Sequence, residues 1–340
     1  MTNSRDSRLA ALSHWLSDSL NLDVSDIRPA SSDASFRRYF RAQVGPQSYI
    51  VMDAPPGHED VRPFIHISEL LRASGIQAPE IHARDVDQGF LLLCDFGSHS
   101  YLDRLNEQTA DELYGDAIAS LLRMQKGVDT ASSRLPPYDE TLLCNEMNLF
   151  RDWFLGKLLG IQLSDGEHEL LNGMWQSLID SALEQPRVCV HRDYHSRNLM
   201  VTEQKNPGVL DFQDAVVGPV TYDLVSLLRD CYISWPQARI DAWVANFHER
   251  VRDASIITDV DLPRFRRWFD LMGMQRHLKA VGIFSRLKLR DGKSGYIGDI
   301  PRTLGYILDV SRHYPEFAEF RRFLETRAQP VFAGVLETAA

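Results

Sequence analysis

The sequence has few cysteines, and they are not spaced as a metal site or a disulfide framework would need. The four cysteines lie far apart, and no two of them form a CxxC pair. Paired CxxC motifs would indicate a zinc site, and closely spaced cysteines in a short secreted chain would indicate a disulfide scaffold. We therefore expect reduced cysteines that lie mainly in the core: Cys94, Cys144, Cys189 and Cys231.

Long apolar runs and an excess of positive charge are also missing. No run approaches the roughly 20 apolar residues that span a membrane, and the N-terminal segment MTNSRDSRLAALSHWL has no apolar signal region. The net charge of −10 argues against a general nucleic-acid-binding protein, which needs a basic face. We expect a cytoplasmic, monomeric protein that has neither a membrane nor a nucleic-acid polymer as a partner.

The pattern of apolar residues changes along the 340 residues of the chain. Residues 37–44 (RRYFRAQV) and 48–53 (SYIVMD) are typical of two strands joined by a turn, and FLLLC at 90–94 is typical of a buried strand. Beyond these strands the spacing is mostly helical, apart from strands around 188–213. The pattern predicts an α+β fold with a small antiparallel-sheet lobe over residues 1–95 and a larger helical lobe over residues 96–340.

A charged segment, HRDYHSRNLM at residues 191–200, separates two apolar stretches that are typical of strands. Phosphoryl transfer needs an oriented hydroxyl, a held metal ion and stabilised charge rather than covalent help from the protein. Asp193 is suited to accept the proton of a hydroxyl, and Asn198 offers an amide oxygen, a hard ligand for magnesium. Asp211 follows at the end of an expected strand, where its carboxylate would hold magnesium against phosphates. This arrangement is the protein-kinase catalytic-loop pattern, and it predicts a protein-kinase-like fold.

Two other interpretations of this segment stay open. Its aspartate and asparagine are also typical of polar turns and helix caps. His191 and His195 have the four-residue spacing of a helical zinc site, although the segment is typical of a loop and has no third histidine or cysteine nearby. An HRD triplet alone is common, but HRD with a correctly spaced asparagine and a following LDF between strands is much more specific.

The segment VHRDYHSRNLMV, followed by GVLDFQDAVVGPVTYDLVSLLRD, resembles the aminoglycoside phosphotransferase and choline kinase superfamily. Within it, the chain is most similar to the bacterial kinases that phosphorylate N-acetylmuramate and N-acetylglucosamine at the anomeric position in cell-wall recycling. This likeness covers most of the chain and rests on SSDASFRRYFR, YIVMDAPP, NEMNLFRDWF and MGMQRHLKAVGIFSRLKLRDGKSGYIGDIPRTLGYI. It implies an enzyme that uses ATP and Mg²⁺ and takes a small amino sugar as its acceptor.

The resemblance also implies roles for individual residues. His191 and Arg192 join Asp193 as catalytic-loop residues, and Asn198 and Asp211 would hold magnesium. The stretch SSDASF takes the place of a glycine-rich loop, and FLLLCDFG resembles a hinge whose backbone would hydrogen-bond adenine. The expected nucleotide-binding residues are Ser32, Ser35, Arg37, Arg38, Asp95 and Phe96, and the expected acceptor contacts are Glu146, Asn148, Gln275, Arg276 and Lys279.

One departure from the kinase pattern affects the nucleotide site. Kinases carry a lysine in the third strand that holds the α- and β-phosphates. Here YIVMD places Val51, Met52 and Asp53 at that point, and no lysine precedes Lys126. The arginines of RRYFR on the adjacent strand offer guanidinium groups that can hold phosphate in a bidentate manner.

Two other functions also stay open from the sequence. A kinase of another small alcohol, such as an aminoglycoside, choline or homoserine, would have the same catalytic loop. A nucleotide-binding regulator that has lost catalysis would account for the missing strand lysine. A protein that only binds nucleotide, however, does not need Asp193 as a base.

Overall fold

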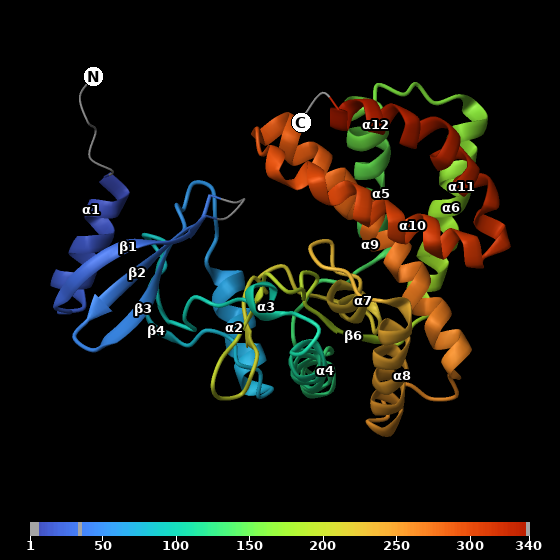
Figure 1. The fold of residues 1–340 in the computed structure, drawn as a ribbon. Helices are drawn as coiled ribbons and strands as arrows, with labels where there is room; N and C mark the ends of the chain where they lie inside the picture. The colour runs from blue at the N-terminus through green and yellow to red at the C-terminus, as the bar shows by residue number, and fades with distance from the viewer. Residues whose placement is uncertain (1–6, 33–35, 338–340) are drawn as a thin grey trace, which may run out of the picture. The chain divides into compact units, whose positions relative to one another are not determined.

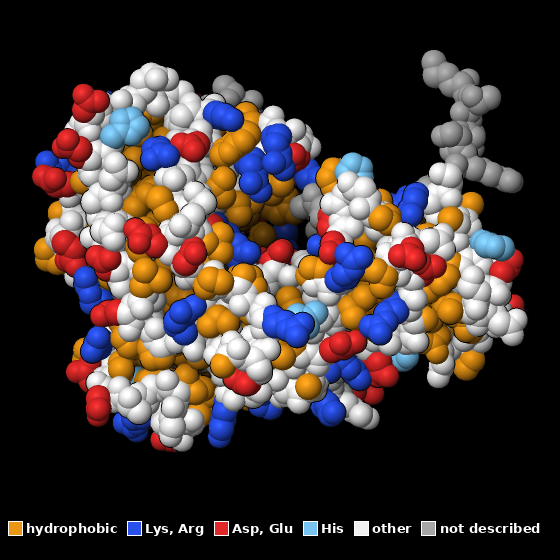
Figure 2. Space-filling model, turned by 180° about the vertical axis from the view of Figure 1, so that it is seen from behind, with side chains coloured by type: hydrophobic (Ala, Val, Ile, Leu, Met, Phe, Trp, Pro, Cys, Tyr) orange, Lys and Arg blue, Asp and Glu red, His pale blue; other side chains and the backbone are white. Residues whose placement is uncertain are grey.

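The computed structural model describes residues 7–32 and 36–337, and the side chains of Ser31 and Ser32 also lie outside the described part. By contacts the chain divides into two compact units (Figure 1): Met1–Met124 with Arg197–Asp214, and Gln125–Ser196 with Ala215–Ala340. The expected boundary at residue 95 lies just after the last strand of the sheet. The division into lobes of residues 1–95 and 96–340 stays a prediction. Acidic and basic side chains are intermixed over the face of the molecule in Figure 2.

The first unit contains a five-stranded antiparallel sheet in the order β1-β2-β3-β5-β4. The two strands expected around Gly45 and the buried strand FLLLC are confirmed. The edge strand β1 was not expected, because it contains Pro29, which is tolerated only where no neighbouring strand needs its N–H. The strands are β1 (Val24–Ser32), β2 (Arg38–Val44), β3 (Gln47–Asp53), β4 (Ile81–Asp85) and β5 (Phe90–Cys94).

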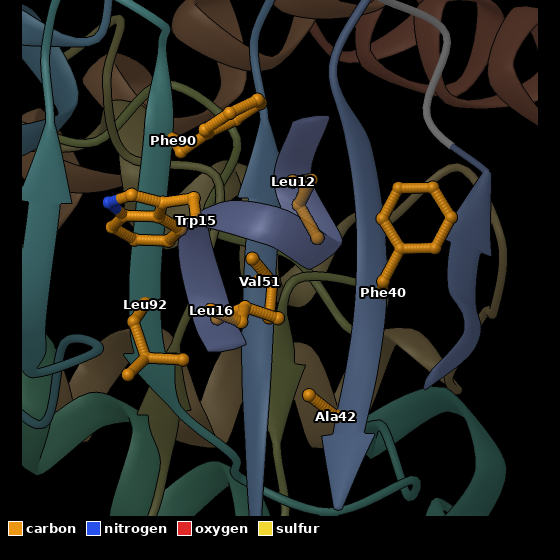
Figure 3. Packing of buried hydrophobic residues seen from close by; sticks show 8 residues of the cluster. All are labelled: Leu12, Trp15, Leu16, Phe40, Ala42, Val51, Phe90 and Leu92. Carbon is orange, nitrogen blue, oxygen red and sulfur yellow. The ribbon is translucent and has the colours of Figure 1, made fainter. Parts of the chain in front are cut away.

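An N-terminal helix covers one face of this sheet. The three- and four-residue spacing of Leu9, Leu12, Leu16 and Leu20 predicts an amphipathic helix, and α1 (Ser7–His14) continued by the π-helical turn η1 (Trp15–Ser19) confirms it. Its apolar side chains pack on those of β2, β3 and β5 (Figure 3). The buried cluster consists of Leu12, Trp15, Leu16, Phe40, Ala42, Val51, Phe90 and Leu92.

The other elements of the first unit follow the sheet or return to it from later in the chain. Three helices follow strands β3 and β5, and the third of them ends just beyond the boundary of the unit. The short strands β7 and β8 pair with each other in antiparallel fashion. These elements are α2 (Arg62–Ala73), α3 (Tyr101–Arg104), α4 (Ala110–Gly127), β7 (Leu199–Met200) and β8 (Gly208–Val209).

The second unit is mainly helical, as the sequence predicts, and includes one two-stranded antiparallel pair, β6 with β9. Its longest helix, α9 (Leu262–Asp291), packs against α5, η2, α6, α7 and α10 (Figure 1). The remaining elements are α5 (Glu140–Leu149), η2 (Phe150–Leu158), α6 (Asp165–Leu183), β6 (Arg187–Val190), β9 (Val216–Pro219), α7 (Tyr222–Leu228), α8 (Gln237–Asp253), η3 (Ser294–Asp299), α10 (Ile300–His313), η4 (Pro315–Phe317), α11 (Ala318–Phe323), η5 (Leu324–Ala328) and α12 (Gln329–Glu337).

A glycine in α9 allows the close approach of this helix to α5. A Cβ atom at Gly282 would lie 2.3 Å from the backbone carbon of Leu149 and 2.5 Å from the backbone nitrogen of Phe150. We expect Gly282→Ala to lower the free energy of unfolding by at least about 2 kcal/mol, because backbone atoms cannot move aside locally and the core is overpacked. Urea unfolding followed by circular dichroism measures this change.

Gly173 provides the matched control, because it lies within α6 and a Cβ atom there meets nothing within 4 Å. Alanine has a higher helix propensity than glycine, so Gly173→Ala is expected to raise the free energy of unfolding by up to about 1 kcal/mol. Equal effects of the two substitutions would contradict the close approach at Gly282.

Candidate active site

The loop that carries Asp193 begins directly after β6 and is held by two buried carboxylates. The backbone N–H groups of His191 and Arg192 donate to Asp223, at 2.7 and 3.0 Å. Ser196 donates to Asp230 from its backbone N–H at 3.0 Å and from its hydroxyl at 2.5 Å. Arg192 has a φ of 77°, which is a strained value for a residue with a side chain. The carboxylates at both ends of α7 therefore fix a backbone that would not be stable alone.

Asp193 lies in the middle of this loop and remains partly exposed. Its N–H meets the Nδ1 atom of His191 at 3.2 Å, and its carbonyl accepts from the N–H of His195 at 3.0 Å. Burial acts to raise the pKa of the Asp193 carboxyl, but nearby positive charges, above all Lys279, outweigh it and lower the pKa to about 2. The other charges that lower it are those of His195, Arg276 and Arg192. Asp193 is therefore ionised at any pH at which the protein would work.

Several expected acceptor contacts meet in one buried network around Glu146. The Glu146 carboxylate pairs with Arg192 and accepts from Tyr138, and it lies 3.1 Å from Lys279 Nζ. Gln275 also donates to Glu146, at 3.1 Å, and Lys279 donates to the hydroxyl of Tyr222 at 3.0 Å. These residues come from α5 and the segment before it, the catalytic loop, α7 and α9. The network joins the residue beside Asp193 to the helical core.

The other two expected acceptor residues have different surroundings. Arg276 is 5% exposed, and its Nη1 lies 3.7 Å from the sulfur of Cys231. Asn148 accepts from the indole N–H of Trp175 at 3.2 Å and donates towards Cys144. Asn148 thus has contacts that fit packing between α5 and α6, whereas Arg276 shares its surroundings with Asp193. Their roles in acceptor binding stay predictions.

The two expected magnesium ligands lie together in the first unit. Asn198 Nδ2 donates to Asp211 Oδ2 at 3.2 Å, and Gln213 donates to Asp211 Oδ1 at 2.8 Å. Strands β7 and β8, which pair Leu199 with Val209, bring these positions together. The described residues contain no group of three or more His, Cys, Asp or Glu side chains able to hold a metal alone. One carboxylate with one amide oxygen nevertheless fits magnesium, which usually takes few protein ligands together with phosphates and water.

Asn198 and Asp211 line a cavity of about 420 Å³ whose lining residues all belong to the first unit. The expected hinge residues Asp95 and Phe96 line it too. The Asp95 side chain accepts from Arg41 at 2.5 and 3.0 Å and from the N–H of Gly97 at 2.8 Å. This carboxylate therefore orders the turn after β5, and the expected contact of the turn's backbone with adenine stays a prediction.

A buried ion-pair cluster lies at the end of β3, the strand from which the lysine is missing. Asp53 at the end of β3 is fully buried and accepts from the Nε atoms of Arg8 and Arg38, each at 3.0 Å. The expected phosphate residue Arg38 is thus paired with this carboxylate, and Arg37 is paired with Glu59 at 3.0 Å. Ser35 and the side chain of Ser32 lie outside the described residues, so the expectation for the serine-rich stretch stays a prediction.

The sequence did not lead us to expect two of the interactions described above. The Asp53 pair had a usable signal, because a turn at Gly45–Pro46 sets a register in which Arg38 lies directly opposite Asp53, as the structure shows. The contact between Asp230 and Ser196 had none, because 34 residues separate them and neither lies in a periodic pattern.

The carboxyl of Asp223 has a raised pKa, so the free energy of unfolding is expected to depend on pH. Burial raises its pKa to about 7, against the two backbone N–H donors, which lower it. An unfolded aspartate has a pKa near 3.8, so between about pH 4 and 7 the folded protein keeps a proton that the unfolded chain has lost. This contribution to the free energy of unfolding is present below about pH 4 and is lost as the pH rises through about 7.

Asp223→Asn removes this titration, and we expect the difference in unfolding free energy between wild type and variant to change steadily from pH 5 to pH 8. The wild type should lose more stability over this range than the variant. Urea unfolding at several pH values measures the difference. A difference that is independent of pH would show that Asp223 is ionised in the folded protein throughout.

Comparison with known proteins agrees with the resemblance found in the sequence. The chain matches the family model described as phosphotransferase enzyme family over residues 26–269. It is 47% identical over 324 residues to the N-acetylmuramate/N-acetylglucosamine kinase of Pseudomonas putida, across 92% of this chain and 95% of that protein. The kinase of the same name from Pseudomonas aeruginosa is 46% identical over 336 residues, across 96% of this chain and 98% of that protein. The resemblance stated from the sequence is confirmed.

Solved structures with low sequence identity share the fold. An ADP-bound aminoglycoside phosphotransferase matches with a TM-score of 0.56 and 15% identity, over 88% of this chain and 98% of that one. A choline kinase from Streptococcus pneumoniae matches with a TM-score of 0.61 and 12% identity, over 88% and 99%. The expected protein-kinase-like fold is thus confirmed. Among the described residues, no helix has the length and apolar character needed to cross a membrane.

Proposed function

Because the chain belongs to the phosphotransferase enzyme family, we propose that it transfers the γ-phosphate of ATP to the anomeric hydroxyl of N-acetylmuramate and N-acetylglucosamine. The observation that carries this proposal is the place of Asp193 on a loop held by Asp223 and Asp230, among cations that lower the pKa of its carboxyl. The relatives at 46–47% identity, which are named for these two sugars, supply the acceptor. The sugar phosphates formed would enter UDP-sugar salvage for peptidoglycan in the cytoplasm.

In this proposal Asp193 orients the acceptor and takes its proton. The anomeric oxygen forms a bond to the γ-phosphorus while the bond from that phosphorus to the β–γ bridging oxygen breaks, and ADP leaves. The anomeric hydroxyl is more acidic than an ordinary alcohol, so a carboxylate with a pKa of about 2 suffices to receive its proton late in the transfer. Holding the hydroxyl in line is the larger contribution of this fixed loop.

The oxygen atoms of Asp211 and Asn198 would hold Mg²⁺, which supplies positive charge against the phosphates when it is bound. Both side chains line the cavity beside the turn after β5, and both carry hard oxygen donors. The stretch Val51–Asp53 carries no lysine and no lysine precedes Lys126, so no strand of the five-stranded sheet offers a lysine to share this task. The chain therefore depends on Asp211 more than a kinase with that lysine would.

The charges around Asp193 favour a neutral or anionic acceptor. The cations Arg192, Arg276 and Lys279 all act on the Asp193 carboxyl, and the Glu146 carboxylate pairs with Arg192 and Lys279. An aminoglycoside or choline would bring further positive charge to this place, at a cost in electrostatic energy. N-acetylglucosamine is neutral and N-acetylmuramate carries a carboxylate, so both fit these charges better.

Phosphate transfer from magnesium-ATP to N-acetylmuramate, N-acetylglucosamine, kanamycin, choline and homoserine tests the proposal in parallel assays. We expect transfer to the two amino sugars, with the phosphate at the anomeric position by phosphorus NMR. Transfer only to another of these acceptors would support a kinase activity but show that the substrate is a different one.

One observation favours a second candidate, a nucleotide-binding regulator without catalysis. The strand stretch Val51–Asp53 lacks the lysine on which kinases rely, and Asp53 at its end is paired with Arg8 and Arg38. Nucleotide binding without transfer to any of the acceptors would support this alternative.

A further inference from the structure

A row of aromatic rings leads away from the catalytic loop within the second unit. The ring of His195, two residues after Asp193, lies against the ring of Tyr232 in a T-shaped arrangement, with centroids 5.3 Å apart and planes at 74°. Tyr232 is 6.4 Å from Phe284, and Phe284 stacks on Tyr296 at 5.5 Å with planes at 15°. Phe284 is only 5% exposed, whereas Tyr232 and Tyr296 are partly exposed. The buried ring thus supports two accessible ones.

Tyr232 is fixed in place by the same groups that fix the catalytic loop. Its backbone N–H donates to Asp230 Oδ1 at 3.0 Å, while the other oxygen of that carboxylate holds Ser196. The neighbouring carbonyl of Cys231 accepts from Arg302 at 2.6 Å. One carboxylate therefore sets the position of the Tyr232 backbone relative to the loop of Asp193, so that the ring needs little ordering when a ligand arrives.

An accessible ring that contacts the catalytic loop suits a sugar. A pyranose has an apolar face made of C–H groups and a polar rim of hydroxyls, and binding sites combine aromatic surfaces with a few placed polar groups. A quaternary ammonium would also suit a tyrosine face, but the cations Arg276 and Lys279 beside Asp193 oppose it. The ring and the charges together favour an uncharged sugar ring.

We propose that Tyr232 is the surface on which the acceptor sugar ring stacks while its anomeric hydroxyl meets Asp193, and that Tyr296 extends this surface. The inference rests on the proposed function and adds a residue that determines acceptor specificity. If Tyr232 only packed against its neighbours, it would contribute to the stability of the fold and not to binding of the acceptor. Acceptor KM and unfolding temperature separate the two roles.

We expect Tyr232→Ala to raise the KM for N-acetylglucosamine and N-acetylmuramate at least about 10-fold, which corresponds to about 1.4 kcal/mol of binding. The KM for ATP should stay within about twofold, because the cavity expected to hold the nucleotide is lined by residues of the first unit and not by this ring. Tyr232→Phe keeps the ring and should restore the acceptor KM. Tyr232→Leu keeps apolar bulk against Phe284 without a ring, so it should fold and still show the raised KM.

Trp153→Ala provides the matched control in the same unit. Trp153 is partly exposed, and its ring is covered by Lys157, whose Nζ is 3.6 Å from the ring centroid. Loss of this ring should leave the acceptor KM unchanged. Saturation-transfer NMR with N-acetylglucosamine on the nucleotide-free protein gives a second measurement. Protons on one face of the sugar should receive saturation in the wild type and lose most of it in Tyr232→Leu.

The outcomes separate this inference from the proposed function. If the wild type transfers phosphate to the amino sugars while Tyr232→Leu keeps the wild-type acceptor KM, the stacking surface is wrong and the function stands. If the wild type neither binds nor phosphorylates either sugar, the proposed function fails, and the stacking surface fails with it. A raised acceptor KM with an unchanged KM for ATP supports both.

Discussion

Replacing Asp193 with asparagine is expected to lower kcat by about 10² to 10⁴-fold, the usual contribution of a positioned base. Asparagine has the same shape but cannot accept a proton from the acceptor hydroxyl. The loop should keep its conformation, because Asp223 and Asp230 hold it through groups on either side of position 193. Nucleotide binding should therefore be close to that of the wild type. A coupled assay of ADP release at saturating ATP and amino sugar measures the change.

Asp180→Asn is the control for this substitution. Asp180 is exposed on α6 in the same unit, where it accepts from Gln176. The same chemical change at that position should leave kcat unaltered. If Asp193→Asn retained kcat within about threefold of the wild type, the proposed role of Asp193 as base and orienting group would be abandoned.

Replacing Asp211 with asparagine is expected to lower kcat by about 10² to 10³-fold, the order seen when one electrostatic partner of a developing charge is removed. Asp211 has a φ of 62°, and asparagine tolerates this conformation well, so the backbone should not change. The substitution removes a negative charge while it leaves an oxygen, so binding of Mg²⁺ should weaken more than binding of nucleotide. Rates measured over a range of free Mg²⁺ concentrations, with nucleotide affinity measured by calorimetry, separate these effects.

Asp87→Asn serves as the control in the same unit, because Asp87 is exposed in the turn between β4 and β5. It should alter neither kcat nor the Mg²⁺ dependence. An Asp211→Asn protein with the Mg²⁺ dependence and kcat of the wild type would exclude Asp211 as a ligand. A normal kcat reached only at high Mg²⁺ would limit the role of Asp211 to the affinity for Mg²⁺.

Much of the fold was predictable because it depends on short-range patterns. The strand-like segments RRYFRAQV and SYIVMD, with a turn between them, predicted β2 and β3, and the continuous apolar run FLLLC predicted β5. The edge strand β1 escaped prediction because an edge position relaxes both the alternation and the exclusion of proline. Local spacing therefore predicts the central strands better than the strand at the edge.

The candidate site likewise has features that the sequence predicts and features that it does not. The residue types and spacing of Asp193, Asn198 and Asp211 are local features, so they could be recognised without coordinates. The pairing of Glu146 with Arg192 and Lys279 could not, because 46 and 133 residues separate these partners and each charge alone is also typical of a surface. The same holds for Tyr232, whose neighbouring rings come from two other segments.

The sequence by itself determined the chemistry of this protein: a catalytic-loop pattern with an aspartate, an asparagine and a later aspartate, and the absence of the strand lysine. Only the tertiary structure decided how each charge is used. It placed Asp53 between Arg8 and Arg38, joined Glu146 to the loop beside Asp193, and used Asp223 and Asp230 to hold that loop. The physical reason is that spacing along the chain encodes local structure, whereas the partner of a buried charge depends on which distant helices pack together.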